Sequence, residues 1–443
     1  MVVYAQGPGA DEEAGRRYLG GEQWEAHPPA PLIGKTGRVL GNTFLPLAGL
    51  TREDCSIANT FRCRWNHTNK VPPLSRKEVR QAVEHCTKAH WRPPPGVRLY
   101  VAMGEYAYYA LTGLLHDFSG WRGYLLPQVH AWEPRVPQTA IWRPQMAPGS
   151  KIPVLVTYHL ASLWETPEAA FPTKRDWNKV ASILAGTWPE AYPGHSTVAP
   201  DPWPTYAAFD SEFHEDDHTR LTRYSLATRD RQVWVVEAHQ IYERAATLPG
   251  TTLIMHNAPA DVSHAKRILD YNVVTLEDTM YAHAVLWTGK VGTDEDKGKA
   301  GGAMAHTLNY LGSIYGRMNR WKHLRVVAPK TYSGADALGT LDCWTTGLHG
   351  GLLGELSRDP QSLWVYENLQ KPLVPIIVKM QERTIAVDVA AAKRALGSIE
   401  EQQQQEILRA QAYAGWPINL RSPKHLAQWL YDIEGMKVRQ RYG

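Results

Sequence analysis

Cysteine is scarce in this chain, and long apolar runs are missing from it. Its 443 residues include only 4 cysteines, too few for a disulfide framework, so we expect a reducing cytoplasm. No stretch approaches the ~18 uninterrupted apolar residues of a membrane-spanning helix. The apolar residues 1–5 have no basic segment beside them, so they predict a first buried strand and no signal peptide. We therefore expect neither a disulfide-rich secreted protein nor a membrane partner.

Phenylalanine is also rare, with 6 residues against 17 tryptophans and 21 tyrosines. Rings that carry a polar atom suit wet surfaces and base stacking, although ordinary core and interface packing explains them equally well.

Neither sign of charge dominates, because the chain has 48 Lys and Arg and 44 Asp and Glu, for a formal net charge of +4. This balance permits a polyanionic partner without requiring one. A hydrophobic content of 43% can fill the cores of two or three domains, which excludes a disordered or fibrous chain.

Proline marks the clearest division of the chain. Residues 187–204 contain five prolines and no sustained period, which predicts a linker or a connection along the surface. In residues 1–186, apolar runs alternate with helical patterns, as in a layered α/β domain with a largely parallel sheet. A proline-rich stretch over 127–153 predicts an exposed insertion. The expected strands span 2–5, 55–61, 98–103 and 154–158, and the expected helices span 75–89 and 175–184.

A different pattern follows this division. Three strands in an antiparallel meander and one further strand are expected at 206–213, 223–228, 232–238 and 253–256. A helix should begin near residue 260, and the charged, glycine-rich segment 293–302 predicts a mobile loop. From about residue 369 onward, helix-forming residues recur at helical period and predict a helical tail. The expected fold class is therefore α/β.

Acidic residues interrupt the first strand of the meander. Asp210 and Glu212 are two residues apart on a strand, so both side chains leave the same face. Buried charges are costly unless they are paired, and a divalent cation is one way to pair them. Asp261 lies near the start of the next expected helix, and Tyr332 and Asp336 are four residues apart on one helix face. The alternative is a set of solvated acids and a core tyrosine.

In this order, the four carboxylates and the tyrosine resemble the DEDDy family of 3′–5′ exonucleases. The resemblance is closest to the proofreading domain of family A DNA polymerases, and it covers about residues 205–356. The intervening segments 256–257, 277–280 and 306–318 agree with it. It implies a ribonuclease H-like domain that trims mispaired 3′ ends of DNA.

The resemblance also assigns roles to these residues. Asp210, Glu212 and Asp336 would bind two divalent ions directly, and Asp261 would support the second ion. Tyr332 would orient the attacking water. Two such ions activate water and stabilise charge on the attacking and leaving oxygens of a phosphodiester, and hard oxygen ligands suit Mg²⁺ or Mn²⁺.

Residues 214–218, His-Glu-Asp-Asp-His, offer a second set of metal-ligand types. Because they directly follow the first strand of the meander, we interpret them as a polar loop. Metal binding at this cluster is the alternative.

Seven short segments of the N-terminal half, taken in order, resemble the uracil-DNA glycosylase superfamily, with family 4 closest. The segments are 7–12, 15–18, 33–40, 57–64, 103–107, 121–123 and 156–159. Such enzymes flip a base out of the duplex and read its edge in a pocket. The resemblance implies that Asn59 reads the uracil, Tyr18 stacks on it and His159 stabilises charge on the departing base. Gln6, with the following loop, would contact the sugar and a water.

The chain departs from family 4 at several positions. Gln6 stands where the family has Glu, Leu160 stands where it has Pro, and its stacking Phe corresponds either to Tyr18 or to Leu32. Family 4 carries an iron–sulfur cluster held by four cysteines. Only Cys63 and Cys86 fall near ligand positions, and Cys55 could supply at most a third, so we expect no cluster. Base excision and a DNA-binding relic both remain open for this domain.

Segments 366–369, 372–375, 385–388 and 418–426 resemble the junction between exonuclease and thumb in family A polymerases, with Thr384 in place of a Gly. No palm or fingers would fit before residue 443, so we expect either the leading part of a longer, phage-like polymerase or a separate polymerase chain as partner. The expected parts are a glycosylase-like domain (1–186), a linker (187–204), an exonuclease (205–360) and a thumb start (361–443).

The leading hypothesis is a metal-dependent exonuclease acting on a single strand or frayed 3′ end of DNA, in a bacterial or phage-infected cytoplasm. A non-catalytic DNA-binding scaffold for a separate polymerase is the second hypothesis. The third is uracil excision as the main activity.

Overall fold

A computed structural model describes residues 1–8, 10–21, 23–28, 30–61, 65, 71–90, 94–128, 152–214, 216–240, 250–269, 275–287, 306–383 and 385–436. The chain forms two compact units, Met1–Val378 and Lys379–Gly443. Helices accompany two five-stranded sheets in the first unit, so the predicted α/β class is confirmed at this level. No helix among these residues is both long enough and apolar enough to span a membrane.

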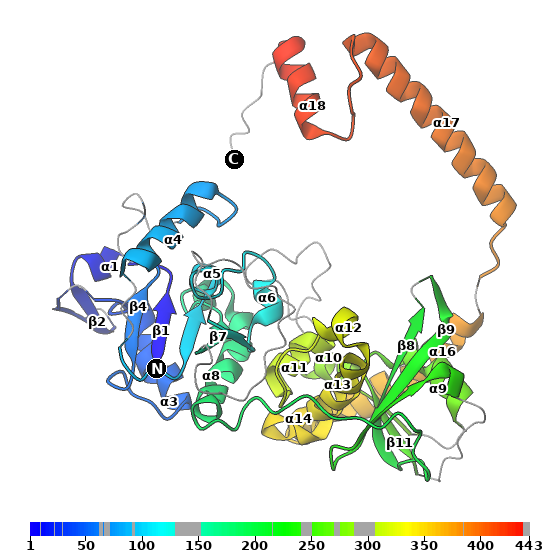
Figure 1. Cartoon of the computed structure of the whole chain (residues 1–443), viewed down its shortest axis with the longest axis horizontal. Helices are drawn as coiled ribbons and strands as arrows, with labels where there is room; N and C mark the ends of the chain where they lie inside the picture. The colour runs from blue at the N-terminus through cyan, green and yellow to red at the C-terminus, as the bar shows by residue number, and fades with distance from the viewer. Residues whose placement is uncertain are drawn as a thin grey trace. The chain divides into compact units, whose positions relative to one another are not determined.

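The first sheet has the strand order β4-β1-β5-β7-β6 (Figure 1). Its strands are β4 (Ser56–Asn59), β1 (Val2–Ala5), β5 (Tyr100–Met103), β7 (Pro153–Thr157) and β6 (Leu125–Pro127). The first four are parallel, as predicted, and β6 runs antiparallel to β7. Every residue of β1, β5 and β7 is buried, as expected for parallel strands covered on both faces.

Helices α5 and α8 pack against this sheet. The predicted helices at 75–89 and 175–184 correspond to α4 and α8. The helices of this part are α1 (Ala10–Glu13), α2 (Lys35–Val39), α3 (Leu45–Leu47), α4 (Lys77–His90), α5 (Glu105–Thr112), α6 (Phe118–Trp121), α7 (Ser162–Glu165) and α8 (Ala170–Leu184). A short antiparallel hairpin of β2 (Arg16–Gly20) and β3 (Gln23–Ala26) was not predicted, and it forms its own two-stranded sheet.

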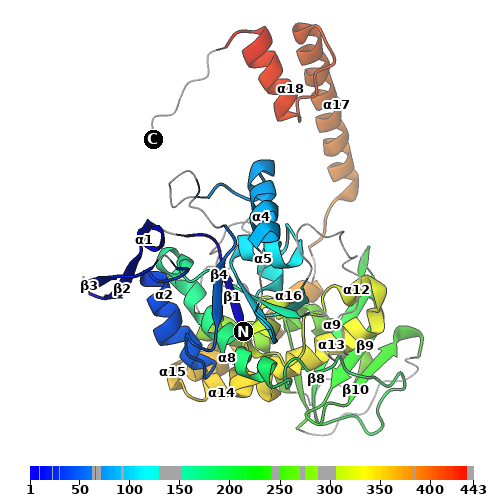
Figure 2. The ribbon, with the colours of Figure 1, turned by 60° about the vertical axis from the view of Figure 1, so that its left-hand side comes forward.

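The second sheet has the order β10-β9-β8-β11-β12. Its strands are β8 (Tyr206–His214), β9 (Asp217–Ala227), β10 (Val233–Glu237), β11 (Thr252–Met255) and β12 (Thr275–Asp278). Figure 2 labels three of them, β8, β9 and β10. The predicted antiparallel meander is confirmed, because β9 pairs antiparallel with both β8 and β10. Strands β11 and β12 continue the sheet parallel to β8, and β12 was not predicted.

Helix α13 packs against β8 and β9, and α9 packs against β8. The predicted helix near residue 260 corresponds to α9. The helices of this part are α9 (Ala258–Ile268), α10 (Thr279–Leu286), α11 (Leu308–Tyr315), α12 (Leu324–Val327), α13 (Pro329–Leu341), α14 (Gly351–Leu356), α15 (Pro360–Val365) and α16 (Lys371–Arg383).

The proline-rich segment 187–204 joins the two sheets within the first unit. Trp188 and Trp203 are buried in the cores of the first and second sheet, respectively. Isolated bridges pair Glu190 with Met318 and Ser196 with Trp234. The segment is therefore a connection held along the fold by its tryptophans and by backbone pairing.

The second unit holds α17 (Val389–Ala414) and α18 (Pro423–Ala427), in the region expected to be a helical tail. The Asp388 carboxylate accepts a hydrogen bond from the amide of Ala391 at 2.8 Å and begins α17, and Gly415 ends it with φ of 73°. Cys63, Thr384, the loop expected at 293–302 and most of the insertion expected at 127–153 lie outside the described residues.

Candidate metal centre

Three carboxylates predicted from the sequence converge in the second sheet. Strand β8 carries Asp210 and Glu212 on one face, and α13 brings Asp336 against that strand. One oxygen from each of the three lies within 4.8 Å of the others. In the described part of the chain, this is the one group of three or more acidic, His or Cys side chains with such spacing.

The site concentrates negative charge in a partly buried place. Burial, and then the charges of Asp336 and Asp261, raise the pKa of Asp210 well above its ordinary value. Oδ2 of Asp210 is buried and has no hydrogen-bond partner among the residues that the structure describes. Burial and the charge of Asp336 also raise the pKa of Glu212. Buried carboxylates with an unpartnered oxygen fit a hard divalent ion such as Mg²⁺ or Mn²⁺.

Asp261 lies on α9, next to this group but not within it. Its Oδ1 accepts hydrogen bonds from the amide of Ser211, at 3.0 Å, and from the Ser211 hydroxyl. Ser211 stands between Asp210 and Glu212 on β8, so Asp261 fixes the strand that carries them. Burial raises the pKa of Asp261 to about 7. Its support of a second ion stays a prediction.

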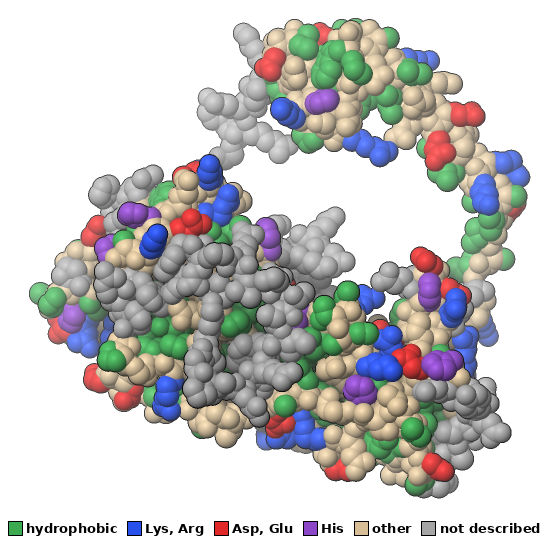
Figure 3. All heavy atoms as spheres, viewed as in Figure 1, with side chains coloured by type: hydrophobic (Ala, Val, Ile, Leu, Met, Phe, Trp, Pro, Cys, Tyr) green, Lys and Arg blue, Asp and Glu red, His purple; other side chains and the backbone are tan. Residues whose placement is uncertain are grey.

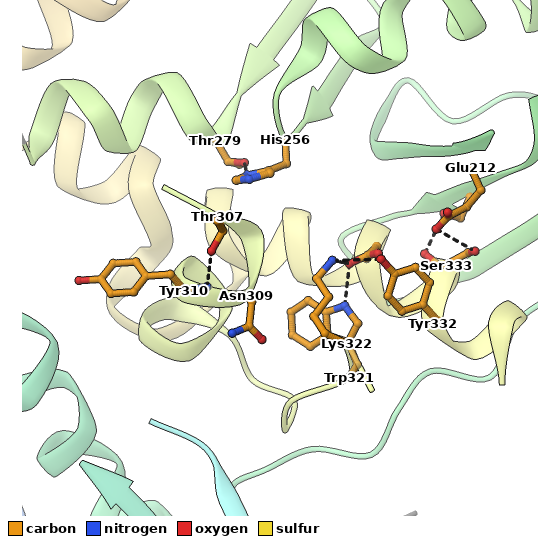
Figure 4. A network of polar contacts seen from close by, with 12 residues as sticks. Glu212, His256, Thr279, Thr307, Asn309, Tyr310, Trp321, Lys322, Tyr332 and Ser333 are labelled. Atoms are coloured by element: carbon orange, nitrogen blue, oxygen red, sulfur yellow. Dashed lines mark hydrogen bonds and ion pairs between the residues drawn. The ribbon is translucent and has the colours of Figure 1, made fainter. Parts of the chain in front are cut away.

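Tyr332 lies one helical turn before Asp336 on α13. Burial and the nearby charges of Asp336 and Glu212 raise the pKa of Tyr332, so its hydroxyl keeps its proton. Nζ of Lys322 lies 3.5 Å from this hydroxyl and forms an ion pair with Oδ1 of Asp336 (Figure 4). The indole Nε1 of Trp321 donates to the same Oδ1 at 2.7 Å. Sequence reasoning missed both Trp321 and Lys322.

Asp278 was recognised only as part of a segment, and its role was missed. It is 2% exposed, and its carboxylate accepts hydrogen bonds from the amides of Met280 and Tyr281 at the start of α10. It also accepts from the amides of Asn257 and Ala258 at the start of α9, at 3.3 and 2.6 Å. One carboxylate therefore caps two helices, and one of these helices carries Asp261.

The cluster at 214–218 lies at the turn between β8 and β9. His214 pairs with Asp217 across the hairpin, and Glu215 lies outside the described residues.

Basic and acidic side chains lie side by side on the face that Figure 3 shows over α12 and β8.

Residues predicted for a glycosylase-like site gather at one edge of the first sheet. Asn59 is the last residue of β4, and Gln6, Gly104 and His159 come soon after the carboxyl ends of β1, β5 and β7. These strands are parallel neighbours, so their carboxyl ends meet at one end of the sheet. Gly104 has φ of 87°, and a Cβ added there would lie 3.1 Å from Cβ of His159. The close approach of β5 and β7 at this edge therefore depends on glycine.

Two polar side chains at this edge have defined hydrogen-bonding states. Asn59 is 6% exposed, its Nδ2 donates to Oε2 of Glu12 at 3.3 Å, and its Oδ1 is buried without a partner in the described part of the chain. Burial lowers the pKa of His159 to about 4, so the ring is neutral at pH 7. Its Nδ1 accepts from the amide of Ala161 at 3.2 Å, which places the ring proton on Nε2.

Tyr18 lies on the unpredicted β2–β3 hairpin. Its hydroxyl donates to the Gly21 carbonyl at 2.8 Å, and its ring centre is 4.9 Å from that of Trp24. The cationic groups of Lys35 and Arg38 lie 5.7 and 5.6 Å from the Tyr18 ring centre. Aromatic and basic side chains therefore already surround the ring that was predicted to stack on a base.

Leu32, the other position predicted for the stacking residue, is buried, and its amide donates to Oε1 of Glu12 at 2.9 Å. Among the cysteines that the structure describes, Cys55 and Cys86 are half-buried, Cys343 is buried, and none of the three is bonded to another.

No family model matches the chain, and no curated protein matches it. Among solved structures, the chain is similar to the POL domain of Pol1 from M. smegmatis in complex with DNA primer-template and dNTP. That match is 20% identical, covers 51% of this chain and 36% of the polymerase chain, and has a TM-score of 0.33. A second similarity is to Brucella melitensis NrnC with bound Mg²⁺, at 14% identity over 40% of this chain and 86% of that chain, with a TM-score of 0.31. Scores of this size do not establish a common fold.

Proposed function

We propose that residues 205–360 form a metal-dependent nuclease that removes nucleotides from DNA 3′ ends. The observation that carries this proposal is the convergence of Asp210, Glu212 and Asp336, with one oxygen of each within 4.8 Å of the others. Desolvation raises the pKa of Asp210, and one of its oxygens is buried with no partner among the described residues. A group of this kind is stabilised by a cation that accepts several carboxylate oxygens at once.

The sheet gives further support. An antiparallel meander of β8, β9 and β10 is continued by the parallel strands β11 and β12, which fits the mixed sheet with helices that the resemblance to a ribonuclease H-like exonuclease implies. Strand β8 carries Asp210 and Glu212 on one face. Tyr332 and Asp336 lie on α13, which packs against β8.

The residues of the chain then have distinct tasks. Asp210, Glu212 and Asp336 would hold the divalent ions, which supply an activated water and charge stabilisation for the phosphodiester when bound. Asp261 holds the backbone of β8 through Ser211. The Tyr332 hydroxyl remains protonated, so it can donate a hydrogen bond to an oxygen beside Asp336 and thereby orient the attacking water.

A 5′-labelled single strand of DNA tests this function. With Mg²⁺ or Mn²⁺ we expect a ladder that shortens from the 3′ end, and with a chelator we expect an intact strand. Asp210→Asn should abolish the ladder, whereas Asp216→Asn, at the exposed tip of the β8–β9 hairpin, should not. A duplex with a mispaired 3′ end should be shortened faster than a fully paired one. Strong binding of the strand without any metal-dependent shortening would favour the non-catalytic scaffold.

A second candidate function, uracil excision, is favoured by the first sheet. Asn59 has a buried amide oxygen with no partner among the described residues, at the end of the sheet where Gln6 and His159 also lie. An amide fixed in this way can pair with the polar edge of a base, and the neutral His159 carries its proton on Nε2, where it can donate to a departing base.

Release of free uracil from DNA in the presence of a chelator would support this second function. Asn59→Ala should abolish the release, and the exposed Asn42→Ala should leave it unchanged. If no uracil is released from single- or double-stranded DNA, the first sheet is better explained as a DNA-binding domain.

We also propose that the parts of the chain are 1–186, 187–204, 205–360 and 361–443, and that a family A polymerase, on the same or a separate chain, supplies synthesis. Burial of Trp188 and Trp203 at the two ends of the connection supports its position between two domains. A cytoplasmic location fits the free thiols of Cys55, Cys86 and Cys343.

A further inference from the structure

Lys322 is a basic side chain inside an acidic centre. Its Nζ forms an ion pair with Oδ1 of Asp336, which is 4% exposed, while Lys322 itself is 27% exposed. The ring of Tyr332 lies 5.0 Å from the same ammonium, and its hydroxyl lies 3.5 Å away. The ammonium is therefore held beside two of the five residues of the proposed nuclease centre (Figure 4).

The charge of Lys322 acts on more than its direct partner. It opposes the repulsion that Asp210 experiences from Asp336, Asp261 and Glu212. It acts in the same direction on Glu212, together with Arg223 and Arg325. Lys322 is thus paired directly with Asp336, and its charge also favours the ionised forms of Asp210 and Glu212.

The position of Lys322 is fixed by its neighbours in the sequence and in space. The preceding residue, Trp321, is fully buried, and its indole donates to the same oxygen of Asp336 at 2.7 Å. Oδ1 of Asp336 therefore has two donors, one neutral and one charged. A divalent ion bound to this carboxylate would lie beside the ammonium of Lys322. The two positive charges would repel each other, because they would be close together in a partly buried site.

We propose that Lys322 is a built-in counter-ion of the metal centre. In the metal-free protein it neutralises Asp336 and holds the acidic group together, and a divalent ion must displace its ammonium to bind. Lys322 therefore sets the concentration of Mg²⁺ or Mn²⁺ that the site requires. This inference rests on the proposed function, because it concerns the same metal centre. Lys322 is a positioning residue, since it acts through Asp336.

Direct measurement of Mn²⁺ binding to the full chain tests this inference. Lys322→Met removes the charge and keeps the length of the side chain, so we expect Mn²⁺ to bind about tenfold more tightly by titration calorimetry or electron paramagnetic resonance. Lys322→Arg keeps the charge and should bind Mn²⁺ like the unaltered protein. Lys330→Met is the matched control, because Lys330 lies on α13 but pairs with Glu237, away from the acidic group. It should leave Mn²⁺ affinity unchanged.

Thermal unfolding gives a second readout. Without metal, Lys322→Met should unfold at a temperature a few degrees lower, roughly the effect of one lost ion pair, because the carboxylates then repel without compensation. Saturating Mn²⁺ should raise its unfolding temperature by more than it raises that of the unaltered protein. If Lys322→Met does not fold without metal, Lys322→Gln replaces it in the same measurements.

The Mn²⁺ titrations separate the role of Lys322 from the existence of the metal centre. Equal or weaker Mn²⁺ binding by folded Lys322→Met and Lys322→Gln would overturn the role of Lys322, while metal-dependent shortening of DNA by the unaltered protein would leave the proposed function standing. Absence of any Mn²⁺ binding to the unaltered protein would overturn the metal centre and the role of Lys322 together.

Discussion

The guanidinium of Arg122 donates to Oδ1 of Asp176 at 2.7 Å, and both side chains are at most 1% exposed. The other carboxylate oxygen accepts from the hydroxyl of Thr157 at 2.8 Å. Arg122 also donates to Ser313 on α11. Nζ of Lys179 donates to the Gly123 carbonyl at 2.9 Å. Buried polar groups thus link the part of the chain that forms the first sheet to helix α11.

Replacing Asp176 by Asn should strongly destabilise the first unit. The substitution leaves the Arg122 charge buried without a carboxylate, and breaking a buried pair in this way costs about 3–5 kcal/mol in the free energy of unfolding. Urea unfolding followed by tryptophan fluorescence measures it. Asp117→Asn breaks the half-exposed pair with Arg320 and should cost less than about 1 kcal/mol. Equal losses of unfolding free energy in the two variants would show that the buried Arg122–Asp176 pair contributes no more to stability than the half-exposed pair.

Replacing Tyr332 by Phe separates water positioning from metal binding. The phenyl ring keeps the packing of α13 but loses the hydroxyl, so we expect the rate of 3′ shortening to fall by about 10²-fold. Mn²⁺ affinity should stay within about twofold, because the hydroxyl holds no ion in this proposal. Tyr281→Phe, on α10, is the control and should retain the full rate. A parallel fall in Mn²⁺ affinity would instead place the Tyr332 hydroxyl among the metal ligands.

Replacing Asp278 by Ala should affect two helices at once. Its carboxylate accepts four backbone hydrogen bonds, two at each of α9 and α10, so the loss should be about 2–4 kcal/mol of unfolding free energy, twice that of a single cap. Asp359→Ala removes an exposed cap of one helix, α15, and should cost about 1 kcal/mol. Urea unfolding of both variants gives the comparison. Similar losses would mean that Asp278 supports only one helix.

Several strands and the acidic group could be predicted because their signals are local. Strands β1, β5 and β7 are continuous apolar runs, since parallel strands covered on both faces need no polar residue. Asp210 and Glu212 interrupt such a run, and that contrast is visible in a single sequence. Asp278 could have been recognised too, since an Asp before Thr and an apolar helix is a cap signal.

Other features depend on contacts that no local pattern carries. The β2–β3 hairpin has four-to-five-residue strands of mixed polarity, so no alternation marks it. Lys322 precedes Asp336 by 14 positions and lies outside any helix or strand, and only the packing of Trp321 brings it to the carboxylates. The orientation of the Asn59 amide likewise depends on Glu12, which lies in a different segment and accepts a hydrogen bond from the Asn59 nitrogen. The Asn59 oxygen then has no partner among the described residues.

Metal binding should be tied to proton release, because burial and mutual repulsion raise the pKa values of Asp210 and Glu212, and that of Asp261 to about 7. A carboxyl group with a raised pKa holds its proton to higher pH, and it must lose that proton to bind a metal. Mn²⁺ affinity should therefore increase as pH rises from 6 to 8, and binding at pH 6.5 should release protons. Titration calorimetry in two buffers of different ionisation enthalpy counts the released protons.

Mn²⁺ binding to Asp261→Asn should release fewer protons than binding to the unaltered protein, whereas binding to the exposed Asp216→Asn should release the same number. Binding that is independent of pH over this range would mean that the carboxylates are already ionised without metal, and that the Lys322 ammonium suffices to neutralise them.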